Sequence, residues 1–103
     1  MTDKEATRWA MQEARRVTRK ILQGSGVRAY LFGSRAIGVH RQFSDIDIAL
    51  DGRGKAVRPR ILSDLREAME ESHIPFRVDV VDAAGFAPTL RKEIFKKGEL
   101  WNA

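Results

Sequence analysis

The sequence predicts an α/β fold whose elements follow in the order helix, strand, strand, helix, strand, helix. Two kinds of segment alternate along the chain: stretches with apolar residues every three or four positions, and short apolar runs bounded by glycine, proline or aspartate. The 103 residues are 43% hydrophobic and 32% charged, which is typical of one globular domain with a modest core. We therefore expect a single domain over residues 1–103.

The first half of the chain predicts one long helix and two strands. Residues 2–23 are expected to be helical because apolar side chains recur at helical spacing, at Ala6, Ala10, Ala14, Val17 and Ile21. The glycines in residues 24–26 end this helix. Residues 27–32 and 44–50 are predicted strands, and residues 35–43 a short helical or irregular piece between them.

The second half of the chain predicts two helices around a third strand. Pro59 suits the first turn of a helix that runs to about residue 72, with an apolar stripe formed by Ile61, Leu62, Leu65, Ala68 and Met69. Residues 76–81 are predicted to be the third strand. Residues 88–97 are predicted to be the last helix, capped by Gly98.

A net charge of +5 and a pI of about 10.1 predict a surface that attracts phosphate groups. The basic residues form three groups: Arg15, Arg16, Arg19 and Lys20; Arg53, Lys55, Arg58 and Arg60; and Arg91, Lys92, Lys96 and Lys97. We interpret them as solvated faces of helices and loops, with a dedicated nucleic-acid surface as the alternative. No aromatic residues interleave with them in a stacking pattern, and Trp9 and Trp101 are expected in the core or facing a partner.

Several other sites are disfavoured. The chain has no cysteine, so disulfides and thiolate metal sites are excluded, and His40 and His73 lack metal-ligand spacing. There is no P-loop motif, and the glycines of residues 24–29 follow a helix, where a dinucleotide fingerprint would follow a strand. The polar N-terminus and the lack of a long apolar stretch favour a cytoplasmic protein without a membrane span.

Two aspartates spaced two residues apart are the strongest indication of a catalytic or metal-binding site. On a strand, Asp45 and Asp47 point to the same face about 6.5–7 Å apart. Carboxylates this close repel each other, and a divalent cation such as Mg²⁺ relieves that repulsion. Asp79 would complete a group of three if its strand neighbours theirs, whereas Asp82 is more typical of a turn or a helix-leading residue. The structural alternative is that arginines neutralise these aspartates.

The segment Gly33-Ser34-Arg35 is a candidate phosphate-binding turn. Gly33 lacks a Cβ and allows close approach of a ligand, and Ser34 offers a hydroxyl and an N–H group to a phosphate oxygen. Arg35 could pair with a phosphate or with one of the aspartates. Such a turn gains significance from its position between a strand and the paired aspartates.

Residues 33–38 (GSRAIG) and 44–49 (SDIDIA) resemble the GSRARG and SDIDLA segments of minimal nucleotidyltransferases of the DNA polymerase β superfamily. Residues 76–82 resemble the later strand of the same proteins, and the similarity spans roughly residues 27–101. Ile37 departs from the pattern, since many relatives have arginine there.

The resemblance implies a small mixed β-sheet flanked by helices and a specific reaction. It implies that Asp45, Asp47 and Asp79 are catalytic and bind two Mg²⁺ ions, and that Gly33 and Ser34, with Arg35 beside them, bind the triphosphate of ATP or another NTP. An acceptor hydroxyl would then attack the α-phosphate with loss of pyrophosphate.

The resemblance also implies a partner. Minimal proteins of this family usually act beside a helical protein of the HEPN or substrate-binding type, often as the antitoxin of a pair, and some transfer AMP to a tyrosine of that partner. A hetero-oligomer is therefore expected, with a homodimer as another possible assembly. Two other functions remain open: a partner-binding module without catalysis, and a nucleotidyltransferase for a small molecule or an RNA end.

Overall fold

The computed structural model describes residues 2–35 and 45–102. Helix α1 (Asp3–Leu22) occupies almost the whole range predicted for the first helix. Thr2 caps it, since its hydroxyl oxygen accepts a hydrogen bond from the Glu5 amide at 3.2 Å. One side of α1 is buried through Ala10, Ala14, Val17, Thr18 and Leu22.

Four strands form one sheet in the order β3-β2-β1-β4. Strands β1 (Arg28–Phe32) and β2 (Ile46–Asp51) pair antiparallel, whereas β3 (Val78–Asp82) runs parallel to β2. The parallel pair needs a crossover, which helix α2 (Pro59–Glu71) provides. The expected mixed sheet flanked by helices is confirmed.

The last helix, α3 (Pro88–Lys97), has the predicted bounds. The sequence analysis missed strand β4 (Glu99–Leu100), which pairs antiparallel with β1, because two residues carry no periodicity. It also missed the 3-10 turn η2 (Ala83–Gly85). The third strand begins at Val78 and not at residue 76, because its ladder with β2 starts where Val78 pairs with Ile46.

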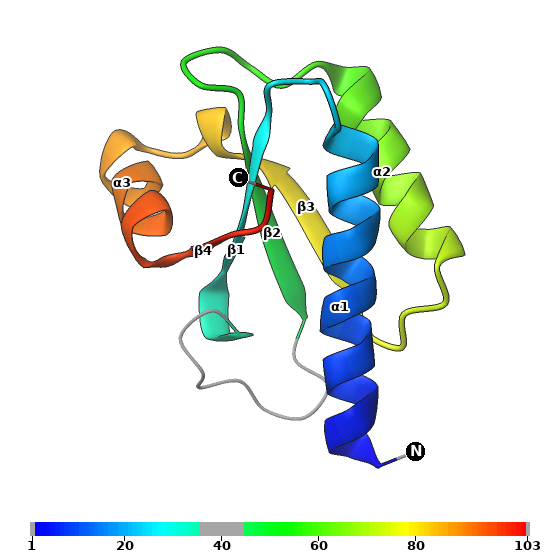
Figure 1. The fold of residues 1–103 in the computed structure, drawn as a ribbon. Helices are drawn as coiled ribbons and strands as arrows, with labels where there is room; N and C mark the ends of the chain where they lie inside the picture. The colour runs from blue at the N-terminus through cyan, green and yellow to red at the C-terminus, as the bar shows by residue number, and fades with distance from the viewer. Residues whose placement is uncertain (1, 36–44, 103) are drawn as a thin grey trace.

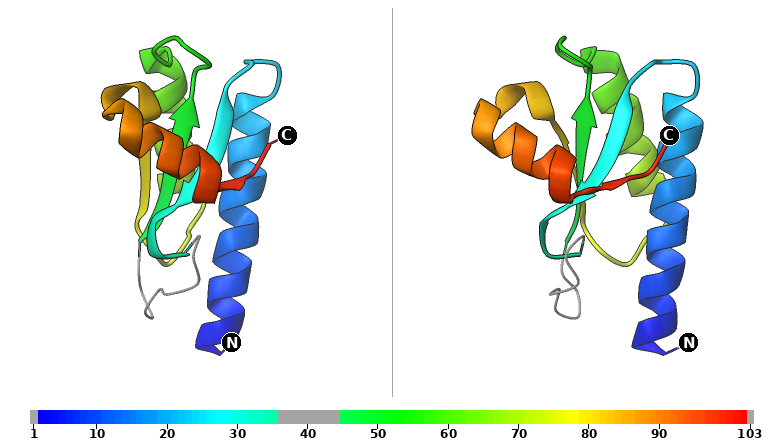
Figure 2. Two further views of the ribbon diagram at one scale, coloured as in Figure 1. Left: turned by 90° about the vertical axis from the view of Figure 1, so that its left-hand side faces the viewer. Right: turned by 60° about the vertical axis from the view of Figure 1, so that its left-hand side comes forward.

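Helices α1 and α2 lie on one side of the sheet and α3 on the other (Figures 1 and 2). The alternation of side chains along β2 divides the core accordingly. Ile46, Ile48 and Leu50 face the cluster that includes residues of α1 and α2, whereas Ala49 packs with Tyr30 and Ile94 on the α3 side. Asp45 and Asp47 share the side of Ala49 by the same alternation.

The predicted irregular piece lies outside the described residues beyond Arg35, as do Ile37, Gly38 and His40. Trp101 is buried in the core, as expected, and Trp9 is 39% exposed. Within residues 2–35 and 45–102, no helix has both the length and the apolar character that crossing a membrane requires.

Candidate active site

The register of the parallel strand pair brings the predicted carboxylates together. Asp47 of β2 is the direct neighbour of Asp79 of β3, and Asp45 directly precedes β2. Neighbouring strands lie about 4.8 Å apart, so Asp47 and Asp79 stand side by side on the α3 side of the sheet. The condition set by the sequence analysis, that the strand of Asp79 should neighbour that of the paired aspartates, is met.

The glycine turn lies directly against Asp47. Gly33 follows β1 and begins the 3-10 turn η1 (Gly33–Arg35), which also contains the backbone of Ser34. The φ of Gly33 is 75°, which is in the left-handed region. A Cβ atom at this position would lie 2.6 Å from Oδ2 of Asp47. Glycine is thus required twice, by the backbone conformation and by the approach of the carboxylate.

The surroundings of Asp47 oppose its ionisation. Burial raises its pKa above the ordinary value, and the charges of Asp79 and Asp45 raise it further. The positive charges of Arg35 and Arg77 act in the opposite direction without cancelling the rise. Burial together with the two neighbouring carboxylates therefore makes the ionised form of Asp47 costly.

Arg35 is one of two buried polar or charged side chains among the described residues. Its guanidinium lies over the ring of Phe76, with Cζ 4.7 Å from the ring centroid. Burial lowers its pKa, and the charges of Asp45 and Asp47 oppose that shift. Arginine stays protonated in such a setting, so Arg35 is a fixed cation beside the two aspartates.

The donor chemistry of the three aspartates fits Mg²⁺, which prefers carboxylate oxygens. As the side chains stand, no group of three or more His, Cys, Asp or Glu residues in the described part of the chain is arranged to hold a metal ion. A bound cation would relieve the mutual repulsion of these carboxylates. The backbone positions suit a metal site, and the side chains would need to converge on the ion.

Asp82 has a structural role at the other end of β3. Its Oδ1 accepts a hydrogen bond from the Ala84 amide at 3.0 Å, and its Oδ2 accepts one from the Val57 amide at 2.9 Å. It pairs in register with Leu50, three residues beyond the Asp47 and Asp79 pair. The interpretation of Asp82 as a turn residue is confirmed.

Sequence reasoning missed Phe76 and Arg77 as residues of this site. Phe76 carries the ring beneath Arg35, and Arg77 contributes positive charge at Asp47. Arg77 precedes Asp79 by two residues, so strand alternation could have indicated a shared face. Phe76 offered no such signal, because its contact with Arg35 crosses between distant segments.

An apolar hollow of about 250 Å³ adjoins the glycine turn. It lies between the end of β1 and helix α3, and its lining is formed by Phe32, Gly33, Leu90, Glu93, Ile94, Lys97 and Gly98. Leu90 at its edge is 48% exposed. The site thus combines a carboxylate group, a left-handed glycine turn and an adjacent apolar surface.

Known proteins share this arrangement of elements. The sequence pattern described as "Polymerase beta, Nucleotidyltransferase" matches residues 19–101. No curated protein sequence matches the chain significantly.

Three solved structures show the same fold. A candidate minimal nucleotidyltransferase is similar with a TM-score of 0.67 and 25% identity over 95% of this chain and 94% of that chain. A toxin–antitoxin complex determined with AMP-PNP has a TM-score of 0.63 and 24% identity over 86% of this chain and 73% of that one. A mutant of the toxin–antitoxin pair MntA–HpeT has a TM-score of 0.58 and 26% identity over 82% of this chain and 68% of that one.

Proposed function

Because the chain belongs to the polymerase β nucleotidyltransferase family, we propose that it transfers AMP from ATP to a hydroxyl group of a partner protein in a Mg²⁺-dependent reaction. One observation carries the proposal. Asp47 stands in register with Asp79 and lies so close to the glycine turn that a Cβ on Gly33 would be 2.6 Å from its carboxylate. A phosphate chain at the turn would therefore lie beside the carboxylates.

Each residue of the site has a proposed role. Asp45, Asp47 and Asp79 would hold two Mg²⁺ ions, which would activate the acceptor hydroxyl and neutralise charge on the departing pyrophosphate. Gly33 and Ser34 would bind the triphosphate through backbone N–H groups that approach it closely. Arg35 sits beside Asp45 and Asp47 and would balance part of the charge that the nucleotide brings.

The proposed reaction exchanges a phosphoanhydride bond of ATP for a phosphate ester bond to the acceptor. The acceptor oxygen forms a bond to the α-phosphorus, the bond from this phosphorus to the bridging oxygen of the β-phosphate breaks, and pyrophosphate leaves. The hydroxyl proton of the acceptor passes to solvent water, so the products are the adenylylated acceptor, pyrophosphate and a proton. The raised pKa of Asp47 agrees with a site that cations would complete, because burial and the neighbouring carboxylates disfavour its ionised form.

The nucleotide and the partner are inferred from relatives. One similar structure is a toxin–antitoxin complex determined with AMP-PNP, an analogue of ATP, and another is the MntA–HpeT pair. We propose that this chain likewise acts as an antitoxin or catalytic subunit beside a helical HEPN-type or substrate-binding protein, and that a tyrosine hydroxyl of that partner is the acceptor.

One alternative is a partner-binding module without catalysis. On this alternative the chain would mask its partner by binding alone.

The deciding experiment follows label from ATP to the purified partner, with Mg²⁺ present. Transfer from α-³²P-ATP but not from γ-³²P-ATP, lost in the Asp45→Asn/Asp47→Asn double variant, is the expected result. A partner that binds tightly and stays unlabelled would favour the binding module. Label that appears only on RNA or on a small molecule would exclude the protein acceptor while retaining nucleotidyl transfer.

A further inference from the structure

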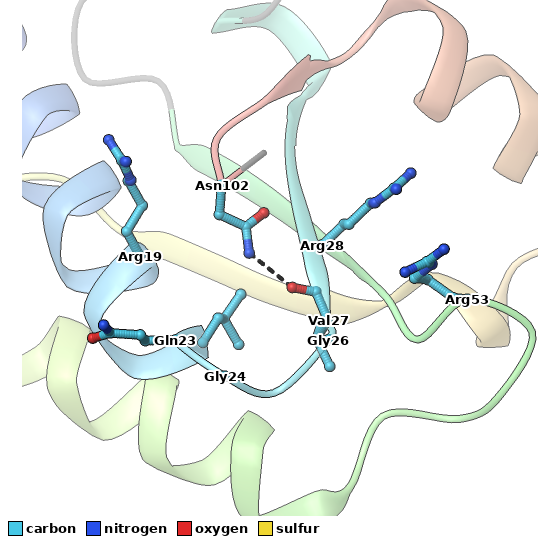
Figure 3. A pocket seen from close by; sticks show the side chains of 9 residues that line it. Arg19, Gln23, Gly24, Gly26, Val27, Arg28, Arg53 and Asn102 are labelled. Atoms are coloured by element: carbon cyan, nitrogen blue, oxygen red, sulfur yellow. Dashed lines mark hydrogen bonds between the residues drawn. The ribbon is translucent and has the colours of Figure 1, made fainter.

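A hollow of about 350 Å³ lies at the opposite end of β1 from the candidate active site (Figure 3). It opens between the end of α1 and the start of β1, and its lining includes Arg19, Arg28 and Arg53. Strand β1 runs from Arg28 at this hollow to Phe32 beside the glycine turn, which is about 13 Å of extended chain. The hollow is therefore a second surface, separate from the proposed triphosphate site.

The three arginines come from separate elements and lack acidic partners. Arg19 belongs to α1, Arg28 begins β1, and Arg53 follows β2 with a φ of 57°. All three are exposed, and none is in an ion pair within the described part of the chain. The nearest acidic residue in the strand register, Asp51, accepts a hydrogen bond from the Arg53 amide at 2.8 Å. In Figure 3 the guanidinium groups extend outward around the rim.

The floor of the hollow consists of hydrogen-bonded and buried residues. The Asn102 side chain donates a hydrogen bond to the Val27 carbonyl oxygen at 2.7 Å and accepts one from the Ala29 amide at 2.7 Å. Leu22 and Val27 lie buried beneath it, at 2% and 8% exposure. The hollow is thus a shallow basic surface on a fixed base, without a deep pocket for a small molecule.

Basic residues continue from the hollow along α1, although Arg15 is ion-paired with Glu99 at 3.6 Å and Arg16 with Glu13. A second hollow is lined by Gln12, Arg15, Arg16 and Arg19, so Arg19 belongs to both. Arg8, Gln12, Arg15 and Arg19 recur every three or four residues and therefore share one exposed side of the helix. We call this row together with Arg28 and Arg53 the arginine band. An extended row of charges suits a polymer that carries many phosphates in series.

The composition of the band favours nucleic acid over a protein partner. Protein interfaces are centred on buried aromatic or aliphatic anchors. The exposed large hydrophobic residues in the described part of the chain are Trp9 and Leu90, and neither lines the two hollows of the band. Exposed arginines bind a single anion weakly in water, whereas a polyanion releases counterions at each contact and gains affinity from all of them.

We infer that the arginine band binds the phosphate backbone of nucleic acid, without reading its sequence. Arg19, Arg28 and Arg53 form the centre of the binding surface, and the α1 row extends it. Neither hollow has an aromatic lining residue on which bases could stack, so contacts to phosphates supply the affinity there, and the exposed Trp9 lies beside Arg8 at the far end of the row. The inference does not depend on the proposed nucleotidyl transfer.

Fluorescence anisotropy with labelled 20-base-pair duplexes of RNA and of DNA tests the inference, in the absence of Mg²⁺ and ATP. The triple variant Arg19→Gln/Arg28→Gln/Arg53→Gln is compared with a matched control, Arg60→Gln/Lys92→Gln/Lys96→Gln. Both remove three exposed positive charges from the chain, but the control residues lie outside the band. Circular dichroism checks that each variant is folded, and the three single arginine variants replace the triple variant if it is not.

At 100 mM KCl the band variant should lose at least tenfold in affinity and the control less than threefold. Each phosphate contact contributes roughly 0.9 to the magnitude of the slope of log K against log salt concentration. The loss of three contacts in the band variant should therefore reduce that magnitude by about 2.7. Preference for RNA or DNA would identify the source of the phosphates.

Equal losses in the two variants would overturn the inference, because diffuse net charge would then explain binding. So would the absence of duplex binding by the wild-type protein at 50 mM KCl. An Asp47→Asn variant should bind duplexes like the wild type, which separates this test from that of the proposed enzymatic activity.

Discussion

Replacing Gly33 with alanine should separate nucleotide binding from stability. Two effects are expected at this position. Alanine at a φ of 75° costs about 1–2 kcal/mol of folding free energy. The new Cβ would also lie 2.6 Å from Oδ2 of Asp47, so the carboxylate must retreat by several tenths of an ångström. The end of a short side chain can make that movement at little cost in stability, but it displaces a proposed metal ligand.

Gly54→Ala is the matched control. Gly54 has a φ of 93°, so it imposes similar backbone strain, and a Cβ there would meet nothing within 4 Å. We expect both variants to lose about 1–2 kcal/mol of stability in urea denaturation, or roughly 4–8 °C in Tm for each kcal/mol. Only Gly33→Ala should lose affinity for MgATP, by tenfold or more in isothermal titration calorimetry, because misplacement by about 1 Å can cost about 100-fold.

Wild-type MgATP affinity in a folded Gly33→Ala protein would refute the reasoning. It would show that contact between the turn and the Asp47 carboxylate is irrelevant to the nucleotide. Loss of affinity in both variants to the same degree would also refute it, since strain alone would then be the cause.

Three further predictions follow from the charges and hydrogen bonds of the site. Asp47→Asn, like Asp47→Ala, should abolish Mg²⁺-dependent nucleotide binding without unfolding the protein. Because the pKa of Asp47 is raised in the folded state, the stability of the wild type falls as pH rises from the unfolded pKa through the folded pKa. The variant should therefore be more stable than the wild type in urea melts at pH 7, and this advantage should vanish below about pH 3.8. A variant less stable than the wild type at pH 7 would contradict this. Arg35→Met should raise the pKa of Asp47 further, measured by NMR titration, since it removes a charge that lowers it; an unchanged pKa would exclude the coupling. Asp82→Ala should lower the free energy of unfolding in urea melts by about 1–3 kcal/mol, because two hydrogen bonds are lost, and should leave MgATP affinity intact. Asp79→Asn should instead lose MgATP affinity. The reverse pattern would make Asp82 the third carboxylate of the site.

Much of the fold could be predicted from local pattern. The helix over residues 88–97 has its predicted bounds because Pro88 suits a first turn. Gly98 ends it with an extended backbone, where a Cβ would lie 2.5 Å from the Ile94 carbonyl oxygen. The shared face of Asp45 and Asp47 follows from strand alternation alone. Where the prediction was off, as at the start of β3, pairing with a neighbouring strand decided the boundary.

The features of the candidate site also separate into those that local sequence predicts and those that depend on tertiary contacts. The residue types and their spacing by themselves determined that Asp45 and Asp47 share a face and that Gly33 begins a turn, because those properties depend on a few neighbouring peptide units. Only the tertiary structure decided that Asp79 stands beside Asp47, that Asp47 lies against Gly33, and that Arg35 is buried over Phe76. These contacts join segments up to about forty residues apart, and their register depends on how α2 packs on the sheet, for which no local pattern provides a signal.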